Sequence, residues 1–429
     1  MKKIYKSINL IYSSFDGTDT IPNGYDIFTQ SGTIYFDSYF HFETHLNDRY
    51  DSDVENRKFI LNKKSLDKTS NILNNFFVIS HPTVNYQFIA TDEFKFSDEL
   101  IKKIKDGNLY LIFLQEHETC WESEFVDLCE KLKLLDIPMS RVVLVNNNSK
   151  LEEYKKKYEY DVLVHRSNFL YFSFTKTLKM LESNWVSDKK GKFFMTRNRN
   201  PKSHRVTLLA NLFFNNIIDD VNWSLIPNEG FDFGNYELYK DFFDKEFIDE
   251  NEKIFRYIEN TKKEDDFEQG KGWINLDRGE FTHQKDFHII YHIPEHSPSF
   301  ENSYFNIVTE STYKSKFNNI HITEKSLRPF YFYQFPIFVA TPHHIKYLKK
   351  DYDFDLFDDI IDHSYDNEID DKKRMEMIVS EIKRIHNNKE FFIEFYKNNR
   401  DRFEHNRKVF LQRGFDAKKH DLDFFWNLV

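Results

Sequence analysis

The chain has 429 residues, and 60 Lys and Arg against 70 Asp and Glu give it a formal net charge of −10. This charge disfavours non-specific binding to nucleic acid or to an anionic membrane, while it leaves room for a local basic cleft. Only 11 residues are glycine. Neither G-x-x-x-x-G-K-S/T nor G-x-G-x-x-G occurs, which argues against a P-loop NTPase and an ordinary dinucleotide dehydrogenase.

The composition also bears on the compartment in which the protein works. The two cysteines, Cys120 and Cys129, supply neither a disulfide framework nor a zinc-ligand spacing, so we expect free thiols in a reducing compartment. No run approaches 18 apolar residues, and the first residues lack the pattern of a signal peptide. We therefore expect a cytoplasmic protein without a membrane span. Its aromatic content of 17% argues against intrinsic disorder.

The first part of the chain alternates between short apolar runs and segments of helical spacing. The apolar runs predict buried strands at 75–80, 108–114, 141–145 and 161–164. Helical spacing predicts helices between them at 98–105, 121–135 and 151–158. Strands and helices that alternate with short loops are typical of a parallel sheet covered by helices. The sequence thus predicts an α/β domain over residues 1–186.

The same alternation begins again after a charged linker at 187–192. We expect strands at 193–195, 305–308 and 337–339 and a helix at 203–212. The last 45 residues have the spacing of amphipathic helices. A second α/β domain is therefore predicted over residues 187–400, followed by C-terminal helices at 401–429.

The most informative segment is SYFNIVTESTYKSKFNNIHITEKSLRPFYFYQFPIFVATPHH, residues 303–344. Its first strand delivers Glu310 to the carboxyl edge of a sheet, where open α/β sheets bind ligands. Thr323, Glu324 and Lys325 then open a helix, whose N-terminus together with Lys325 suits a diphosphate. Glu310 and Glu324 accept hydrogen bonds when ionised and suit ribose or sugar hydroxyls. The alternative is a capped helix with solvated charges.

A basic loop follows the first strand of the second domain. Arg197, Arg199, Lys202 and Arg205 place four cations within nine positions, with Asn198 among them. At the end of a strand and the start of a helix, guanidinium groups are well placed to contact phosphate oxygens in pairs. The alternative is an ordinary solvated basic loop.

These two segments resemble the donor-binding region of GT-B glycosyltransferases, especially fucosyltransferase-like and phage-encoded enzymes. Those enzymes have a strand-borne Glu, then T-E-K at the start of a helix, then an apolar strand preceded by Pro, which correspond here to Glu310, 323–325 and Pro336. The resemblance implies two Rossmann-like domains that face each other across a cleft. It also implies that the Glu and Lys contact the ribose and diphosphate of a nucleotide sugar, that Asn198 and its neighbours lie beside it, and that residues 401–429 cross back to the first domain.

Catalytic groups are harder to identify from the sequence. An inverting enzyme of this kind needs a general base near the acceptor hydroxyl, and the first domain usually provides it. Glu116, His117 and Glu118 follow the strand that ends at Leu114 and are the best candidates. They also fit the alternative of ordinary loop residues.

The sequence also contains an acidic motif that bears on metal binding. The D-x-D pairs at 351–355 are of the kind that metal-dependent glycosyltransferases use to hold a cation on donor phosphates. They follow a lysine-rich helix late in the chain, and GT-B enzymes normally need no such motif. We expect no metal and no cofactor, with the nucleotide sugar as a substrate.

The sequence thus favours metal-independent transfer of a hexosyl or pentosyl group from a nucleotide sugar to a hydroxyl of a glycan or small molecule. One alternative is a phage enzyme of the host cytoplasm that modifies hydroxymethylated bases in DNA. Another is a non-catalytic interaction protein on the same scaffold. The donor base and sugar, the acceptor, the stereochemical outcome and the oligomeric state stay open.

Overall fold

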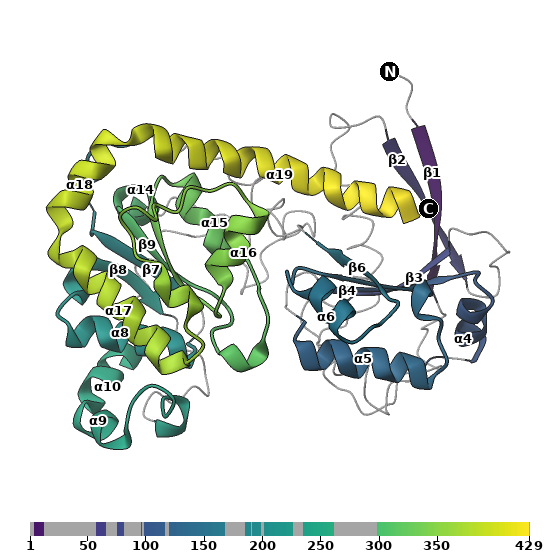
Figure 1. Ribbon diagram of the computed structural model, residues 1–429, viewed down its shortest axis with the longest axis horizontal. Coiled ribbons are helices and arrows are strands. Elements are labelled where there is room, and N and C mark those ends of the chain that lie inside the picture. The colour runs from purple at the N-terminus through teal and green to yellow at the C-terminus, as the bar shows by residue number, and fades with distance from the viewer. Residues whose placement is uncertain are drawn as a thin grey trace. The chain divides into compact units, whose positions relative to one another are not determined.

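The computed structural model describes residues 4–12, 57–65, 75–80, 96, 98–115, 120–167, 185–189, 191–198, 201–225, 235–260 and 298–428 (Figure 1). The chain divides into two compact units. The first unit comprises residues 1–172 and 415–429, and the second comprises residues 173–414. The sequence analysis predicts domain boundaries after residues 186 and 400, whereas these units divide after residues 172 and 414.

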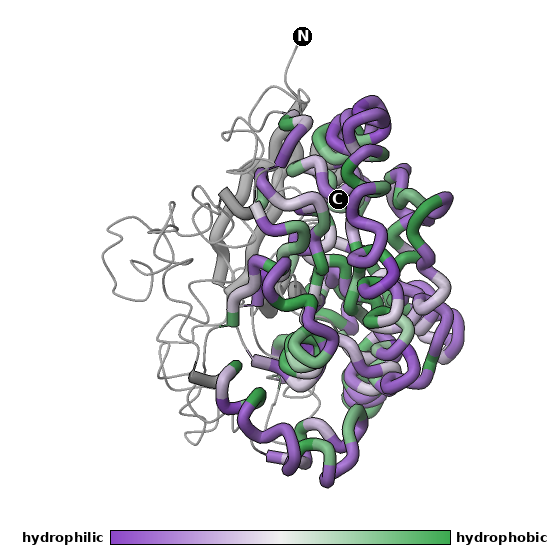
Figure 2. The backbone as a smooth tube through the Cα atoms, turned by 90° about the vertical axis from the view of Figure 1, so that its left-hand side faces the viewer, coloured by the Kyte–Doolittle hydropathy of each residue, from purple (hydrophilic) through white to green (hydrophobic). Residues whose placement is uncertain are grey.

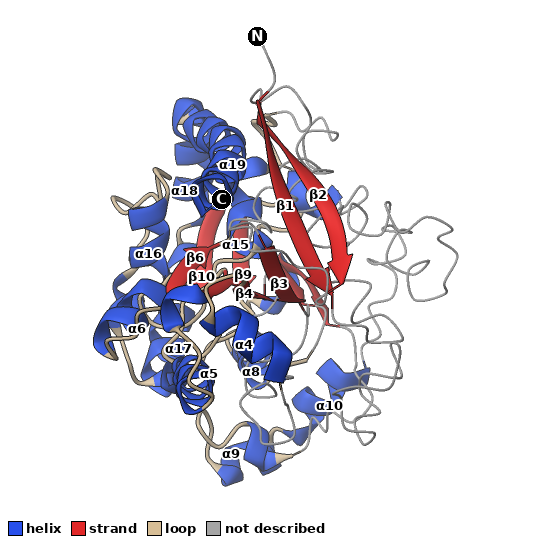
Figure 3. Cartoon of the chain, turned by 90° about the vertical axis from the view of Figure 1, so that its right-hand side faces the viewer, coloured by secondary structure: helices blue, strands red, loops and turns tan. Residues whose placement is uncertain are grey.

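The first unit is built on a parallel six-stranded sheet in the order β2-β1-β3-β4-β5-β6. Its strands are β1 (Ile4–Tyr12), β2 (Arg57–Ser65), β3 (Asn75–Ser80), β4 (Tyr110–Gln115), β5 (Val142–Asn146) and β6 (Leu163–Arg166). Helices α4 (Asp98–Lys105), α5 (Glu122–Leu134) and α6 (Leu151–Lys157) alternate with the later strands. The strands β1 and β2 run side by side in parallel register from Ile4 opposite Arg57 to Tyr12 opposite Ser65 (Figure 3).

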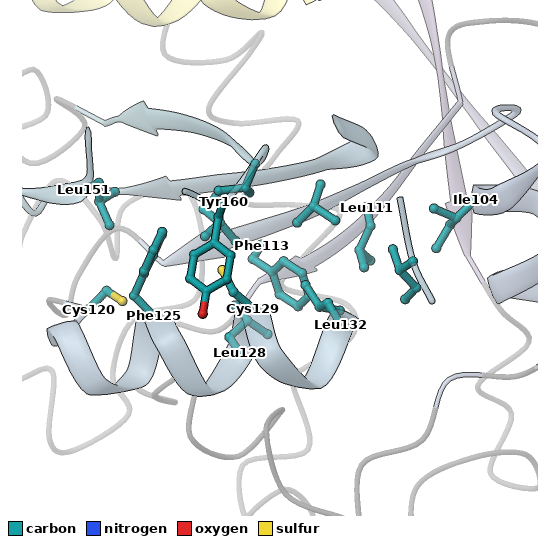
Figure 4. Packing of buried hydrophobic residues seen from close by; sticks show 14 of the residues in the cluster. Ile104, Leu111, Phe113, Cys120, Phe125, Leu128, Cys129, Leu132, Leu151 and Tyr160 are labelled. Carbon is teal, nitrogen blue, oxygen red and sulfur yellow. The ribbon is translucent and has the colours of Figure 1, made fainter. Parts of the chain in front are cut away.

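The core of this unit lies between the sheet and α5. Phe113 of β4 and Phe125, Leu128 and Leu132 of α5 are fully buried (Figure 4). Their spacing on α5 puts them on one helix face, as the sequence pattern predicted. Cys129 packs in the same cluster, and burial raises the pKa of its thiol to about 12. A thiol in this state stays protonated and unreactive near neutral pH.

The second unit contains a parallel four-stranded sheet in the order β10-β9-β7-β8. Its strands are β7 (Phe194–Asn198), β8 (Val221–Leu225), β9 (Phe305–Thr309) and β10 (Phe335–Val339). Its helices are α8 (Ser203–Phe214), α9 (Lys245–Glu250), α10 (Glu252–Asn260), α14 (Pro298–Asn302), α15 (Glu324–Tyr331), α16 (His344–Asp351), α17 (Asp371–Asn387), α18 (Lys389–Asn398) and the first part of α19 (Arg400–Leu428). Hydrophobic and hydrophilic residues alternate along the helices, as in amphipathic segments (Figure 2).

Short 3₁₀ helices complete the described elements, at Met139–Arg141, Ile218–Asp220, Tyr236–Leu238, Ser315–Phe317 and Ser364–Asn367. No helix in the described part of the chain is both long and apolar enough to span a bilayer.

The two described sheets share the order of their first four strands. In each, the first strand in sequence has the second strand on one side and the third on the other, and all neighbours are parallel. This order is doubly wound, with a topological switch point beside the first strand. The α/β class predicted from the alternation of elements is therefore confirmed. In the second unit the switch point lies between β7 and β9.

Lys189 of the segment expected to be a linker, and Trp185 just before it, pack within the second unit. Trp185 stacks on Tyr396, with ring centroids 4.2 Å apart. Lys189 is only 6% exposed, and its ammonium group donates to the carbonyls of Glu301 at 2.8 Å and Phe332 at 3.2 Å. Because no carboxylate accepts from it in these bonds, burial dominates and lowers the pKa of Lys189 to about 7.

The end of α19 packs on the first unit, to which residues 415–429 belong. Phe425 is fully buried, and Phe424 stacks on His165 of β6 with ring centroids 4.1 Å apart. The ring of His420 also stacks on the ring of His165, with centroids 5.0 Å apart. One continuous helix thus contributes residues to both units.

Replacing Lys189 with Met tests the cost of its buried charge. Between pH 7 and about 9.5 the folded wild type loses this proton while the unfolded chain keeps it, so the stability of the wild type gains with rising pH relative to the variant. Over this range we expect the unfolding free energy of the wild type to rise by on the order of 3 kcal/mol relative to that of Lys189→Met. Urea unfolding of both proteins at the two pH values measures it, and an unchanged difference would contradict the account.

Candidate functional site

The carboxyl ends of β7 and β9 are joined at the switch point of the second sheet. Asn198 ends β7 and Thr309 ends β9, and the Thr309 hydroxyl donates to the Asn198 side-chain oxygen. The backbone N–H of Asn198 donates to the hydroxyl of Ser224 on β8 at 3.3 Å. Open α/β sheets bind ligands at this kind of edge, so the loops that follow Asn198 and Thr309 form the candidate site.

Glu310 is the first residue after β9, and its side chain is buried with 1% exposed. Its carboxylate accepts hydrogen bonds from the Ser326 hydroxyl at 2.6 Å, the Thr323 hydroxyl at 2.8 Å, the Thr323 N–H at 3.1 Å and the Ser311 N–H at 3.3 Å. Burial by itself raises the pKa of Glu310, but the positive charge of Lys325 and these hydrogen bonds outweigh it and lower that pKa. Glu310 is therefore an ionised carboxylate whose oxygens already accept from the chain's own donors.

The first turn of α15 is organised around this carboxylate. Thr323 is the N-cap, and its hydroxyl accepts from the N–H of Lys325 at 3.2 Å. A helix N-terminus carries partial positive charge, and Glu310 supplies the anion that faces it. We expected this helix end to hold a diphosphate. That role stays a prediction, and in the structure the anion beside this helix end is the carboxylate of Glu310.

The two charged side chains of the T-E-K motif differ in exposure, since Glu324 is buried and Lys325 is half-buried. The Lys325 side chain is 26% exposed, and its ammonium nitrogen lies 3.6 Å from a carboxylate oxygen of Glu324. Glu324 also pairs with Arg328 at 3.4 Å on the next turn of α15. Lys325 is thus the part of the motif that a ligand can reach, while Glu324 is held between two cations.

The start of α8 supports the same loop from the other side. His204 contacts the Glu310 carbonyl through Nε2 at 3.0 Å, and Arg205 donates to the carbonyls of Thr309 and Glu310 at 3.4 and 3.3 Å. Both side chains are buried. Burial moves the pKa of His204 well below its usual range, so the ring is neutral and donates from Nε2. Burial also lowers the pKa of Arg205 to about 10, which leaves it charged at neutral pH.

A buried chain of hydrogen bonds continues from Glu310 to the start of α16. Ser326 donates its one hydroxyl proton to Glu310 and lies 2.8 Å from Nε2 of His344. Because that proton is already used, Nε2 of His344 must be the donor in the second bond. This fixes the protonated nitrogen of His344 and ties the first turn of α16 to α15.

The outer part of the loop after β9 is held by α17. Arg374, which is 1% exposed, donates to the carbonyl of Tyr313 and to the carboxylate of Asp371, and it lies over the Tyr313 ring with 4.2 Å to its centroid. The N–H of Ser315 donates to the same carboxylate at 2.9 Å. The loop is therefore fixed at its inner end by Glu310 and at its outer end by Arg374.

The structure brings most of the predicted donor-site residues to one edge of the second sheet. Those residues are Arg197 and Asn198 on β7, Arg205 on α8, and Glu310, Thr323, Glu324 and Lys325 around β9 and α15. Arg197 is half-buried and pairs in register with Ser224 of β8. Arg199 and the predicted base candidates Glu116, His117 and Glu118 lie outside the described residues, so their roles stay predictions.

Sequence reasoning missed Ser311, Ser326 and His344. Ser326 lies one turn after Thr323 on the same helix, and this spacing of hydroxyls could have indicated a shared acceptor. His344 follows a strand whose carboxyl end meets the same sheet edge as that of β9, which is a weaker signal. Nothing in the sequence indicates which donors a buried carboxylate will gather.

The acidic D-x-D segment serves as an ion-pair anchor for α19. Asp355 accepts from Arg402 at 2.8 Å, and its carbonyl accepts from Asn406 at 2.7 Å. Among the described residues, no group of three or more His, Cys, Asp or Glu is arranged to hold a metal ion.

Comparisons of this chain with family models, with curated proteins and with solved structures find no match.

Replacing Glu310 with Gln tests whether this carboxylate organises the site. The variant loses the charge that Lys325 and the first turn of α15 face, and we expect it to be less stable at pH 7 by about 3 kcal/mol. A carboxyl whose pKa is lowered by folding stabilises the protein above its unfolded pKa, and this contribution is lost as the pH falls through the folded value. Urea unfolding from pH 7 down to about 3 should show the variant losing less stability than the wild type. Equal stability of the two proteins at pH 7 would contradict the role of Glu310.

Proposed function

We propose that the chain is a GT-B glycosyltransferase that moves a sugar from a nucleotide-diphosphate sugar to a hydroxyl acceptor without a metal ion. The observation that supports this most is the convergence of Arg205 and Lys325, from two distant segments, on one strand end at the switch point of a parallel sheet. Doubly wound sheets bind nucleotides at such points. The resemblance of the same two segments to GT-B donor sites supports it independently.

The chemistry of transfer explains why cations belong at this edge. The bond between the anomeric carbon and the β-phosphate oxygen breaks, and its electron pair stays on the phosphate. The acceptor oxygen forms the new bond to the carbon and gives up its proton. Negative charge therefore develops on the leaving diphosphate, and fixed cations stabilise it without reorganising. In this proposal Lys325 and Arg197 face the diphosphate, and Arg205 adds its charge from the buried layer behind them.

The acceptor and the general base belong to the first unit in this proposal. Glu116, His117 and Glu118 directly follow Gln115, the last residue of β4, and remain the candidates for the base. A deprotonated His or Glu there would accept the proton of the acceptor hydroxyl.

Thermal unfolding in the presence of nucleotides tests donor binding. We expect one of UDP, GDP or ADP, at about 100 times its dissociation constant, to stabilise the wild type by about 2.7 kcal/mol. The Lys325→Ala variant should lose most of this stabilisation because it removes a half-buried cation that the proposal places against the diphosphate.

The matched control is Lys383→Ala, which removes an exposed lysine of α17. It should respond to the nucleotide as the wild type does. A wild type that no nucleotide stabilises, or a Lys325→Ala variant that responds fully, would overturn the proposed donor site.

Chelation of metal ions tests the mechanism. If fixed cations of the chain balance the leaving group, release of nucleoside diphosphate from the preferred nucleotide sugar should proceed at an unchanged rate in excess EDTA. Loss of turnover in EDTA, with recovery on adding Mg²⁺ or Mn²⁺, would contradict a metal-independent reaction. Nucleotide binding without turnover would instead favour a non-catalytic protein on this scaffold.

A further inference from the structure

The first turn of α16 is capped by a residue that is distant in the sequence. The carboxylate of Asp366 accepts from the N–H groups of Ile345 at 2.9 Å and Lys346 at 3.0 Å. The Asp366 carbonyl also accepts at 2.7 Å from the N–H of His343, the N-cap residue, whose φ of 68° lies in the left-handed region. One residue thus fixes the start of α16 through three hydrogen bonds.

The segment that carries Asp366 is itself anchored to β10. The Tyr365 hydroxyl accepts from the N–H of Phe338 at 3.2 Å and lies 3.0 Å from Nδ1 of His363. Nε2 of His363 lies 3.0 Å from the Leu356 carbonyl, which can only accept, so this nitrogen carries the proton. Burial lowers the pKa of His363 and keeps its ring neutral near pH 7. Asp366 is therefore presented to α16 from a fixed position.

The helix α16 passes this constraint to the candidate site. His344 opens the helix directly before the capped N–H groups, and its Nε2 lies 2.8 Å from the Ser326 hydroxyl. Ser326 donates in turn to the carboxylate of Glu310 at 2.6 Å. The same carboxylate accepts from the hydroxyl of Thr323, which lies 3.4 Å from the ammonium nitrogen of Lys325. A movement at the start of α16 therefore reaches Glu310 and Lys325 through a continuous set of contacts.

The capping carboxylate of Asp366 is buried, with 7% exposed. Burial raises the pKa of this carboxyl to about 6, although the two N–H bonds and the charges of Lys349 and Arg374 favour its ionised form. Asp366 is therefore mostly ionised at pH 7 and mostly protonated at pH 5. The charged and titratable groups that face this segment are Lys349 of α16, Arg374 and Glu381 of α17, and Asp362, His363 and Tyr365 beside it.

We propose that Asp366 is a positioning residue that regulates the candidate site from outside it. The capped first turn of α16 holds His344 against Ser326, and Ser326 holds Glu310 and Lys325. A proton taken up by Asp366 removes the cost of its buried charge, so the closed first turn is favoured at lower pH and the Glu310 network tightens. The ligand affected is the nucleotide of the proposed function, on which this inference rests for its ligand class.

Hydrogen exchange of the full chain without a ligand tests this coupling. When the first turn of α16 opens, the Asp366 carboxyl meets water and its pKa returns to the ordinary value. Protection of the first-turn amides, relative to amides of β10 and corrected for intrinsic exchange rates, should therefore rise about tenfold from pH 7 to pH 5. Protection in the first turn of α15 should rise with it.

Two variants separate the steps of the coupling. Asp366→Asn removes the titrating group and keeps an amide oxygen that can accept. It should abolish the pH dependence in both helices, although His344 and His363 stay in place. Ser326→Ala removes the hydroxyl that joins the two helices and should abolish the pH dependence in α15 alone. A cap that serves only the stability of α16 would produce no pH dependence in α15 of the wild type.

Asp370→Asn is the matched control, because it changes the same chemical group at the exposed N-cap of α17, where the side chain accepts from the N–H of Lys373 at 2.8 Å. It should leave the pH dependence of α15 and α16 unchanged. A wild type without pH dependence in α15 would overturn the regulation by Asp366, and so would a pH dependence in α15 that survives Asp366→Asn or Ser326→Ala. If Asp366→Asn fails to fold, the wild type and Ser326→Ala still decide the outcome.

The coupling and the proposed function can fail separately, because the exchange experiment uses no nucleotide. The expected pH dependence in a chain that no nucleotide stabilises would uphold the role of Asp366 and overturn the donor site. Nucleotide binding by a chain whose α15 ignores Asp366 would do the reverse.

Discussion

A single buried carboxylate organises the candidate site. Glu310 follows β9 at the switch point of the second sheet, and its oxygens accept from the loop beside it and from the first turn of α15. Moving an ionised carboxylate from water into the protein interior costs free energy unless hydrogen-bond donors surround it. The donors that surround Glu310 are therefore held where they are, and Lys325 is held with them. The position of Lys325 is a consequence of satisfying the buried anion.

The fold supplies the rest of the arrangement. In a doubly wound parallel sheet the chain turns in opposite directions after β7 and β9, so the loops that follow these strands separate. The hydrogen bond between Asn198 and Thr309 keeps the two strand ends together. Arg205 and His204 then fasten the start of α8 to the backbone of β9 and Glu310. Because the chain has few glycines, we expect an anion at this edge to be held mainly by Lys and Arg side chains and a helix N-terminus, and not by a glycine-rich loop.

Much of the fold was predictable from the sequence, but the division of labour within the site was not. Strands such as 141–145 and the helix face of Phe125, Leu128 and Leu132 follow from hydrophobic periodicity, which reports burial directly. The T-E-K motif opens α15 beside the carboxyl end of β9, where the sequence analysis expected it. It did not show that Glu310 would be satisfied internally, because that depends on α15 bringing Thr323 and Ser326 against the end of β9, which no local pattern encodes. The segment around Lys189 was expected to be a charged linker, since a sequence does not reveal that backbone carbonyls will accept from a buried amine.

Hydrogen exchange of the full chain, with and without its stabilising nucleotide, tests the central claim most directly because it reports where the ligand binds. The account predicts slower exchange in peptides that cover residues 194–205 and 309–326, the segments that carry the cations and the Glu310 network. Slower exchange confined to the first unit, or no change in these two segments at saturating nucleotide, would contradict a diphosphate site at the switch point of the second sheet.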